Sequence, residues 1–193
     1  PSKNISTTII YVKMVAVNRK TKTLINYIIW YIIAVKQLMR GAVKLGDFVH
    51  LHIHSEFSLL DGANRIKDLP VRAKELGMDA IAITDHGVMF GAIDFYKACM
   101  ANGVKPIIGC EVYVAPRGRM DKDPNIDSKY NHLILLAKNN EGYKNLSKLV
   151  SLSWTEGFYY KPRIDKEILE KYHENLICCS ACLAGEVNQA ILK

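Results

Sequence analysis

Residues 79–87, "DAIAITDHG", decide the fold class, because a short apolar run ends here in a polar pair. The run "DAIAIT" is bounded by helix-like segments and predicts a fully buried strand. Asp85 and His86 follow that strand directly. In α/β folds, polar side chains at the carboxyl end of a buried strand mark the edge at which ligands bind. The stretch therefore predicts both a fold class and the edge of the sheet that carries a site.

Outward from this strand, the chain alternates between the two kinds of element. Strands are expected at 48–54, 104–115, 131–139 and 175–182, and helices at 69–77, 88–103, 141–154 and 165–173. Asp68 as N-cap and Gly77 at the end delimit the first helix. In the second helix we expect the apolar side to carry Ile93, Tyr96 and residues 98–100. Such alternation predicts βαβ units and a mostly parallel α/β sheet, closed or open, with a polar loop at 116–129 as a flap or a mobile segment.

The expected strand at 48–54 carries histidines at alternate positions, in "HLHIHSEFSLLDG" at 50–62. Side chains alternate between the two faces of a strand, so His50, His52 and His54 share one face. Histidine is the commonest metal ligand, and Asp61, with Glu56 as the rival, supplies a nearby carboxylate. This set suits zinc, manganese or iron. Taken alone, it also fits an edge strand with solvated histidines.

Polar residues interrupt or end the other apolar strands as well. Glu111 lies inside "KPIIGCEVYVA", where a carboxylate is costly unless it is paired or bound to a metal. Cys182 ends "NLICCSAC", and we expect both to lie on the same edge as His86. Asp85 fits equally well as the N-cap of the following helix. His132 precedes its apolar run, so the strand-end rule assigns it no role.

Composition indicates one globular domain with an uneven distribution of charge. The chain has 193 residues, 49% of them hydrophobic, and a formal net charge of +7. Residues 1–46 contain eight Lys and Arg and no acidic residue, whereas the remainder contains 18 bases and 19 acids. Charge alone therefore predicts no nucleic-acid binding for residues 47–193.

Residues 1–45 differ in composition and charge from the rest, and they are expected to be foreign to the domain at 46–193. Two runs rich in Ile, Tyr and Val, at 5–17 and 24–35, could form a hairpin or a membrane-seeking helix. The second run has only about a dozen apolar residues, fewer than the roughly 18 that a membrane span requires. It also starts too late for a signal peptide. Left unpaired, these runs favour aggregation.

Several motifs, in the right order, resemble the amino-terminal PHP (polymerase and histidinol phosphatase) domain of the bacterial DNA polymerase III alpha subunit family. They include the region 48–98, "KPIIGCEVYVAPR", "HLILLAKNNEGYKNLSKLVS", "GFYYKPRID" and "SACLAGEV". The resemblance implies a distorted parallel (β/α)7-type barrel, truncated at its carboxyl-terminal side. Leu45 would then lie where the family's chains begin, and residues 1–44 would be translated upstream sequence.

The resemblance also implies a set of metal ligands. It assigns this role to His52, His54, Asp61, His86, Glu111, His132 and Cys182, and leaves Asp85 as a partner that orients His86. His50 falls outside the set. The family's final pair of ligands, an Asp-x-His, has no counterpart here, because His173 is the last histidine.

The activity implied is phosphoester hydrolysis with two or three divalent ions of zinc, manganese or iron, which includes a 3′ to 5′ exonuclease role in some polymerases. Partners implied by the family are DNA, the remaining polymerase domains, a separate proofreading exonuclease and a sliding clamp. The Mg-dependent polymerase residues would lie beyond residue 193. The alternatives are a structural module without catalysis and a free-standing phosphatase of the histidinol-phosphatase type.

Two further motifs carry weaker expectations. Cys179 and Cys182 form a single C-x-x-C, a weak metal or redox signal, and five cysteines without a secretion signal suit a reducing cytoplasm. Cys178 is expected on a buried strand. The cluster "FYYKPR" at 158–163 could contact nucleic acid, but we expect a packed loop with solvated charges.

Overall fold

The computed structural model describes residues 48–192, so the expectations for residues 1–45 lie outside the described residues. The elements, in chain order, are α2 (Leu69–Glu75), β1 (Ala80–Ile83), α3 (Ala92–Asn102), β2 (Lys105–Val114), β3 (Asn131–Ala137), α4 (Asn140–Thr155), β4 (Phe158–Tyr159), β5 (Lys161–Ile164), α5 (Lys166–Tyr172), β6 (Leu176–Cys179) and α6 (Glu186–Leu192). Within this part of the chain, no helix is long and apolar enough to cross a membrane.

From residue 69 onward the predicted alternation of strands and helices is confirmed, with β4, β5 and α6 as additions. Local signals explain several of the boundaries. Asn139 accepts a hydrogen bond from the Gly142 amide at the start of α4, and Asp165 does the same for Ile168 at the start of α5. Asp68 occupies the N-cap position of α2, but its carboxylate binds Arg65 instead of capping the helix.

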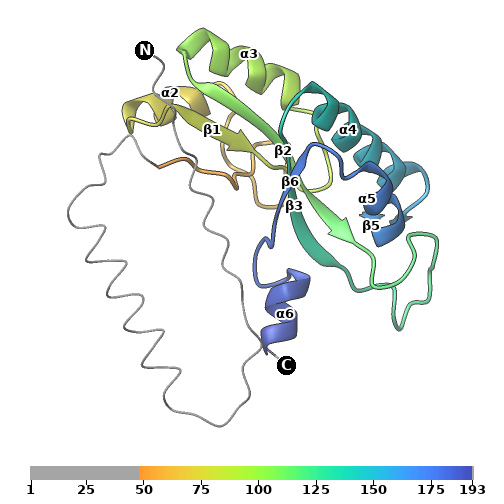
Figure 1. Ribbon diagram of the computed structural model, residues 1–193. Coiled ribbons are helices and arrows are strands. Elements are labelled where there is room, and N and C mark those ends of the chain that lie inside the picture. The colour runs from red at the N-terminus through yellow and green to blue at the C-terminus, as the bar shows by residue number, and fades with distance from the viewer. Residues whose placement is uncertain (1–47, 193) are drawn as a thin grey trace, which may run out of the picture. The chain divides into compact units, whose positions relative to one another are not determined.

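One strand, β2, organises the sheet (Figure 1). Its first half pairs with β1 in parallel, and its second half pairs with β3 in antiparallel orientation and with β5 in parallel. The antiparallel pairs β3–β6 and β4–β5 complete the strand order β4-β5-β2-β3-β6. The described strands therefore form an open mixed sheet.

The expectation of a mostly parallel sheet is wrong, and the described strands do not close into a barrel. The cause lies in the connection between β2 and β3. Parallel neighbours need a crossover of a dozen or more residues, usually a helix, that carries the chain back to the starting edge of the sheet. Residues 115–130 contain no helix and return the chain at the same edge, so β3 runs antiparallel to β2.

Two apolar clusters cover successive halves of β2, with α3 beside the first half and α4 beside the second (Figure 1). Phe95 and Cys99 of α3 are fully buried in the first cluster, and Ala92 at the start of the helix is also buried. The apolar side expected for this helix is wrong for Ile93, Tyr96 and Met100, which are about half exposed. The partner surface selects the buried face, and the sequence of an evenly apolar helix does not reveal it.

The segment 48–54 is extended, but it is not one of the strands. It follows β1 through hydrogen bonds from the Ala82 amide to the His50 carbonyl and from the Thr84 amide to the Ile53 carbonyl. The Thr84 hydroxyl also accepts a hydrogen bond from the Ile53 amide, at 2.9 Å. These contacts fix which side chains of the segment face the sheet edge.

The fully buried Arg163 of β5 holds the loop at 116–129 in place, so "FYYKPR" is not a loop with solvated charges. Its guanidinium donates hydrogen bonds to the carbonyls of Gly157, Arg119, Asp121 and Asp127. Four carbonyl partners satisfy a buried cation that would otherwise be costly. Of the two readings of the loop, an ordered flap fits these contacts better than a mobile segment.

Candidate metal centre

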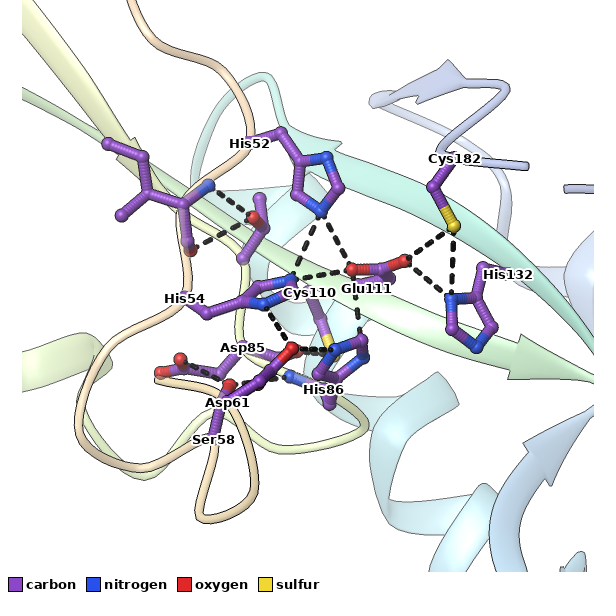
Figure 2. Close-up of polar contacts among 12 residues, drawn as sticks. His52, His54, Ser58, Asp61, Asp85, His86, Cys110, Glu111, His132 and Cys182 are labelled. Carbon is purple, nitrogen blue, oxygen red and sulfur yellow. Dashed lines mark hydrogen bonds and ion pairs between the residues drawn. The ribbon is translucent and has the colours of Figure 1, made fainter. Parts of the chain in front are cut away.

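Glu111, in the middle of β2, is the centre of a cluster of polar side chains (Figure 2). Only 1% of its side chain is exposed. One carboxylate oxygen, Oε2, lies 2.7 Å from His52 Nε2 and 2.6 Å from His54 Nε2. The other, Oε1, lies 2.8 Å from His132 Nδ1. The carboxylate that the sequence marked as costly is thus compensated by three histidines from two separate segments.

Asp61 supplies a second carboxylate, on the solvent side of the cluster. Its Oδ2 atom lies 3.1 Å from His54 Nδ1 and 3.1 Å from His86 Nε2. Because His54 presents its other nitrogen to Glu111, it bridges the two carboxylates. The side chain of Asp61 is half exposed, in contrast to the buried Glu111.

Cys182 closes the cluster from the turn that follows β6. Its Sγ atom lies 3.5 Å from His132 Nδ1 and 4.0 Å from Glu111 Oε1. The bridge between His132 and Gly185 brings this turn to the start of β3. All seven residues assigned by resemblance therefore lie in one cluster.

The position of His132 follows from the antiparallel direction of β3. In the ladder between β2 and β3, His132 is the register partner of Tyr113, close to the end of β2. The first residues of β3 therefore share an edge with the last residues of β2 and with the turn after β6. Sequence reasoning that assumed parallel strands had no means to place His132 there.

The electrostatics of the cluster favour an anionic Glu111. Burial alone would raise the pKa of Glu111, but hydrogen bonds from His132, His54 and His52 outweigh it and hold that pKa well below its usual range. The hydrogen bond to Glu111 raises the pKa of His54, with further contributions from Asp61. Burial lowers the pKa of His86. A neutral His86 beside a carboxylate that stays charged is a suitable donor pair for a cation.

One ring nitrogen of His86 has no hydrogen-bond partner among residues 48–192. This atom is the buried Nδ1, which lies 3.6 Å from Glu111 Oε2. Buried polar atoms are usually paired, so an unpaired imidazole nitrogen inside a cluster of donors requires an explanation. A cation bound at that nitrogen supplies one.

Ligand atoms gather in three overlapping groups, in each of which all atoms lie within 4.8 Å of one another. The groups are His52, His54 and Glu111; His54, Asp61 and His86; and His86, Glu111 and His132. Imidazole, carboxylate and a nearby thiol are donors that suit zinc, manganese or iron better than calcium. The residues present therefore fit divalent transition metals.

Asp85 has a different role from the one expected. Its buried carboxylate accepts hydrogen bonds from the Ser55 amide at 2.6 Å, the Ser55 hydroxyl at 2.7 Å and the Ser58 hydroxyl at 2.8 Å. Among the described residues it has no hydrogen bond to the His86 imidazole. The Ser58 hydroxyl instead accepts a hydrogen bond from the backbone amide of His86. Asp85 thus positions the turn that carries Asp61. It is linked to His86 through the Ser58 hydroxyl, which contacts the backbone amide of His86.

Sequence reasoning missed the two serines and two aromatic rings of the cluster. Tyr113 stacks on His86, with ring centroids 5.8 Å apart, and Tyr130 stacks on His132 at 5.9 Å. The two tyrosine rings also contact each other, with ring centroids 4.9 Å apart. A tyrosine two residues after Glu111 on the same face of β2 was the one available signal, since alternate strand residues share a face.

Two residues considered at first lie outside the cluster. Glu56, the rival of Asp61, accepts a hydrogen bond from the Ile66 amide. His50 is exposed and contacts the ring of Phe48 edge-on. The choice of Asp61 over Glu56 agrees with this geometry.

Comparison with known proteins gives a consistent family. The profile of the PHP domain matches residues 50–193. The DNA polymerase III subunit alpha of Treponema pallidum is 54% identical over 148 residues, which cover 76% of this chain and 13% of that protein. The subunit of Borreliella burgdorferi is 56% identical over 146 residues, with 75% and 13% covered.

Among solved structures, an amidohydrolase from Chromobacterium violaceum aligns with 52% of this chain and 32% of that chain, at 24% identity and a TM-score of 0.37. The chain matches only about an eighth of the length of the polymerase subunits. From the family match and the identity to these subunits, we conclude that the chain belongs to the PHP domain family and is homologous to the amino-terminal region of the DNA polymerase III alpha subunit.

Proposed function

We propose that this chain is a metal-dependent phosphoesterase domain that cleaves phosphodiester bonds of DNA, in the manner of a 3′ to 5′ exonuclease. The observation that carries the proposal is the buried Glu111 carboxylate, which three histidines contact at 2.6–2.8 Å. A structural core has no need of such a costly arrangement. The homology to DNA polymerase III alpha subunits supports DNA as the substrate.

Seven residues would hold two or three divalent ions, namely His52, His54, Asp61, His86, Glu111, His132 and Cys182. Bound divalent ions lower the pKa of water and neutralise charge on a phosphate that is being cleaved. Among the protein groups, Glu111 contributes a negative charge that persists at low pH, and His86 contributes a neutral ring with a free nitrogen. No side-chain nucleophile is needed.

A cavity of about 450 Å³ opens beside the metal centre, between the segment 50–54 and α2. Its lining includes His52, His54, Asp61, Asn64 and Arg72, whose guanidinium also pairs with Glu75 at 2.8 Å. The volume falls in the range of ligand sites in proteins. The cavity gives the proposed reaction a place for one nucleotide-sized group next to the ligands.

The larger context is also part of the proposal. As part of a polymerase III alpha subunit, the domain would work in the cytoplasm on DNA, alongside the remaining polymerase domains, a separate proofreading exonuclease and a sliding clamp. The polymerase reaction, with its Mg ions, would belong to other parts of such a subunit.

The first experiment measures metal stoichiometry in the purified full chain by elemental mass spectrometry, after dialysis without chelator. We expect two or more equivalents of zinc, manganese or iron, and a loss of most of the metal in Glu111→Gln. Glu56→Gln is the matched control, because this nearby carboxylate lies outside the cluster. The metal-loaded chain should then release nucleotides from a single-stranded oligonucleotide.

Three results would contradict the proposal. A folded chain without metal, or metal retained equally by Glu111→Gln and Glu56→Gln, would reject the metal centre. A metal-loaded chain that hydrolyses neither bis(4-nitrophenyl) phosphate nor an oligonucleotide would favour the structural module without catalysis.

A further inference from the structure

The hairpin of β4 and β5 presents an exposed aromatic residue and a cation side by side. The two strands pair through Phe158 with Pro162 and Tyr159 with Lys161, so Tyr160 alone forms the turn. Tyr160 is 66% exposed and has a φ of +59°, in the left-handed region that bulky residues rarely adopt. Strain of this kind persists only where the surroundings enforce it, and it clusters at binding sites.

The hairpin is rigidly anchored at its base. Arg163, two residues after Lys161, is the buried cation that binds four carbonyls, and its guanidinium carbon also lies 5.2 Å from the centre of the Tyr159 ring. Arg163 therefore supports the Tyr159 ring, which contacts the Tyr160 ring edge-on with ring centroids 4.6 Å apart. The exposed ring of Tyr160 is thus presented on a fixed support.

Lys161 connects the hairpin to the metal centre. Its Nζ lies 5.5 Å from the centre of the Tyr113 ring, whose own ring stacks on His86. Pro162 lies against Gly87, the residue after His86: a Cβ placed on Gly87 would come within 2.8 Å of the proline ring. The ammonium group and a proposed metal ligand, His86, therefore both contact the Tyr113 ring.

The charge of Lys161 is uncompensated in the described part of the chain. Lys144 and Lys166 pair with glutamates at 2.8 Å, whereas no carboxylate among residues 48–192 lies within 4.0 Å of the Lys161 ammonium. A half-buried, unpaired cation beside a phosphoesterase centre suits a phosphate group. An adjacent exposed aromatic ring suits a base, because every base offers a face for stacking.

We propose that the β4–β5 hairpin binds single-stranded DNA beside the metal centre, with Tyr160 stacking on a base and Lys161 contacting a phosphate of the same strand. This inference rests on the proposed function for its substrate and extends it to a polynucleotide. A small phosphate ester held in the metal centre has neither a base for Tyr160 nor a second phosphate for Lys161. The hairpin therefore selects for chain length.

The test is fluorescence anisotropy with the purified full chain and a labelled single-stranded oligothymidylate, in EDTA so that metal-dependent hydrolysis cannot occur. We expect Tyr160→Asn to weaken binding about fivefold or more, since stacking on one base contributes at least that much. Asparagine tolerates the left-handed backbone, so the turn is retained. Tyr160→Phe, which keeps the ring, should bind within about twofold of wild type.

Lys161→Gln should weaken binding about threefold at low salt and reduce the slope of log affinity against log salt by about 0.7, the value for one phosphate contact on a single strand. The chain offers a matched control in α3, where Tyr96 and Lys97 form the same dipeptide and are both exposed. Tyr96→Asn and Lys97→Gln should bind like wild type. Thermal melts monitored by circular dichroism confirm folding of each variant.

The results for the hairpin and for the proposed function are distinguishable. Hairpin variants that bind like wild type, or a wild-type chain that does not bind the oligonucleotide, overturn the inference. Hydrolysis of bis(4-nitrophenyl) phosphate, which carries a single phosphate and no nucleobase, reports on the metal centre without the proposed base and phosphate contacts of the hairpin. If the chain hydrolyses this ester but does not bind the oligonucleotide, the metal centre is supported and the hairpin inference is rejected. If the chain binds the oligonucleotide through the hairpin but does not hydrolyse the ester, the hairpin inference is supported and the proposed function is rejected.

Discussion

His132 Nδ1 lies 2.8 Å from Glu111 Oε1, although His132 lies near the start of β3 and Glu111 lies within β2. The antiparallel turn between the strands brings them together, and Cys182 joins them from the turn after β6. One side of the centre therefore depends on the antiparallel direction of β3.

Removal of the His132 imidazole should lower metal affinity by at least about tenfold, because even residues that only support a ligand cost 10–100-fold. His132→Ala is compared with His173→Ala, whose side chain is exposed and binds the Glu170 carbonyl. Competition with a chromophoric chelator measures both affinities. Equal affinities in the two variants would show that His132 is not a ligand.

Metal affinity should fall as the pH decreases through the range in which the histidines gain protons. The pKa of His54 is raised above its ordinary 6.5 by Glu111, so this ring binds a proton in the metal-free chain already above pH 6.5. A metal must displace that proton, so affinity rises with pH and levels off above the pKa of His54. Chelator competition between pH 5 and 8 tests this, and a flat profile would contradict it.

Arg163→Met should destabilise the fold by about 3 kcal/mol, since it leaves the carbonyls of Arg119, Asp121 and Asp127 without a donor. Urea unfolding followed by circular dichroism gives the free energy of unfolding. Arg65→Met is the comparison, because the Arg65 side chain is mostly exposed and pairs with Asp68 alone among the described residues. Similar unfolding curves for the two variants would show that the loop at 116–129 does not depend on Arg163.

Tyr160→Gly should raise the free energy of unfolding by about 1 kcal/mol, because glycine adopts a positive φ without the cost that an L side chain incurs. Asn175, with a φ of +60°, is the internal comparison. Asparagine already tolerates this conformation, so Asn175→Gly should gain less. Urea unfolding measures both changes, and a loss of stability in Tyr160→Gly would show that the ring itself supports the fold.

Much of the centre could be predicted from residue types along the chain. His52 and His54 alternate along an extended segment, and a carboxylate such as Glu111 inside an apolar strand requires compensation wherever it lies. His86 follows a buried strand, which places it at a sheet edge. These inferences depend on local patterns alone, and the structure brings the residues together.

The remainder depended on the path of the chain between elements. The direction of β3 determines whether His132 lies near Glu111, and no local pattern in "NHLILLAKN" encodes that direction. The turn of Tyr160 was hidden for a similar reason, because tyrosine gives no signal for a positive φ. Ser55 and Ser58, which donate hydrogen bonds to Asp85, are residues that commonly occur in loops and give no local signal. In each case, contacts between distant segments override local preference.

The cluster joins parts of the chain that are far apart in sequence, from His52 at one end of the described residues to Cys182 near the other. An ion shared across it would act as a cross-link that closes a very long loop. Loop closure by such a link removes conformations from the unfolded chain, and the stabilisation grows with the length of the loop. The metal content of a preparation would then determine how firmly the two apolar clusters on β2 hold together.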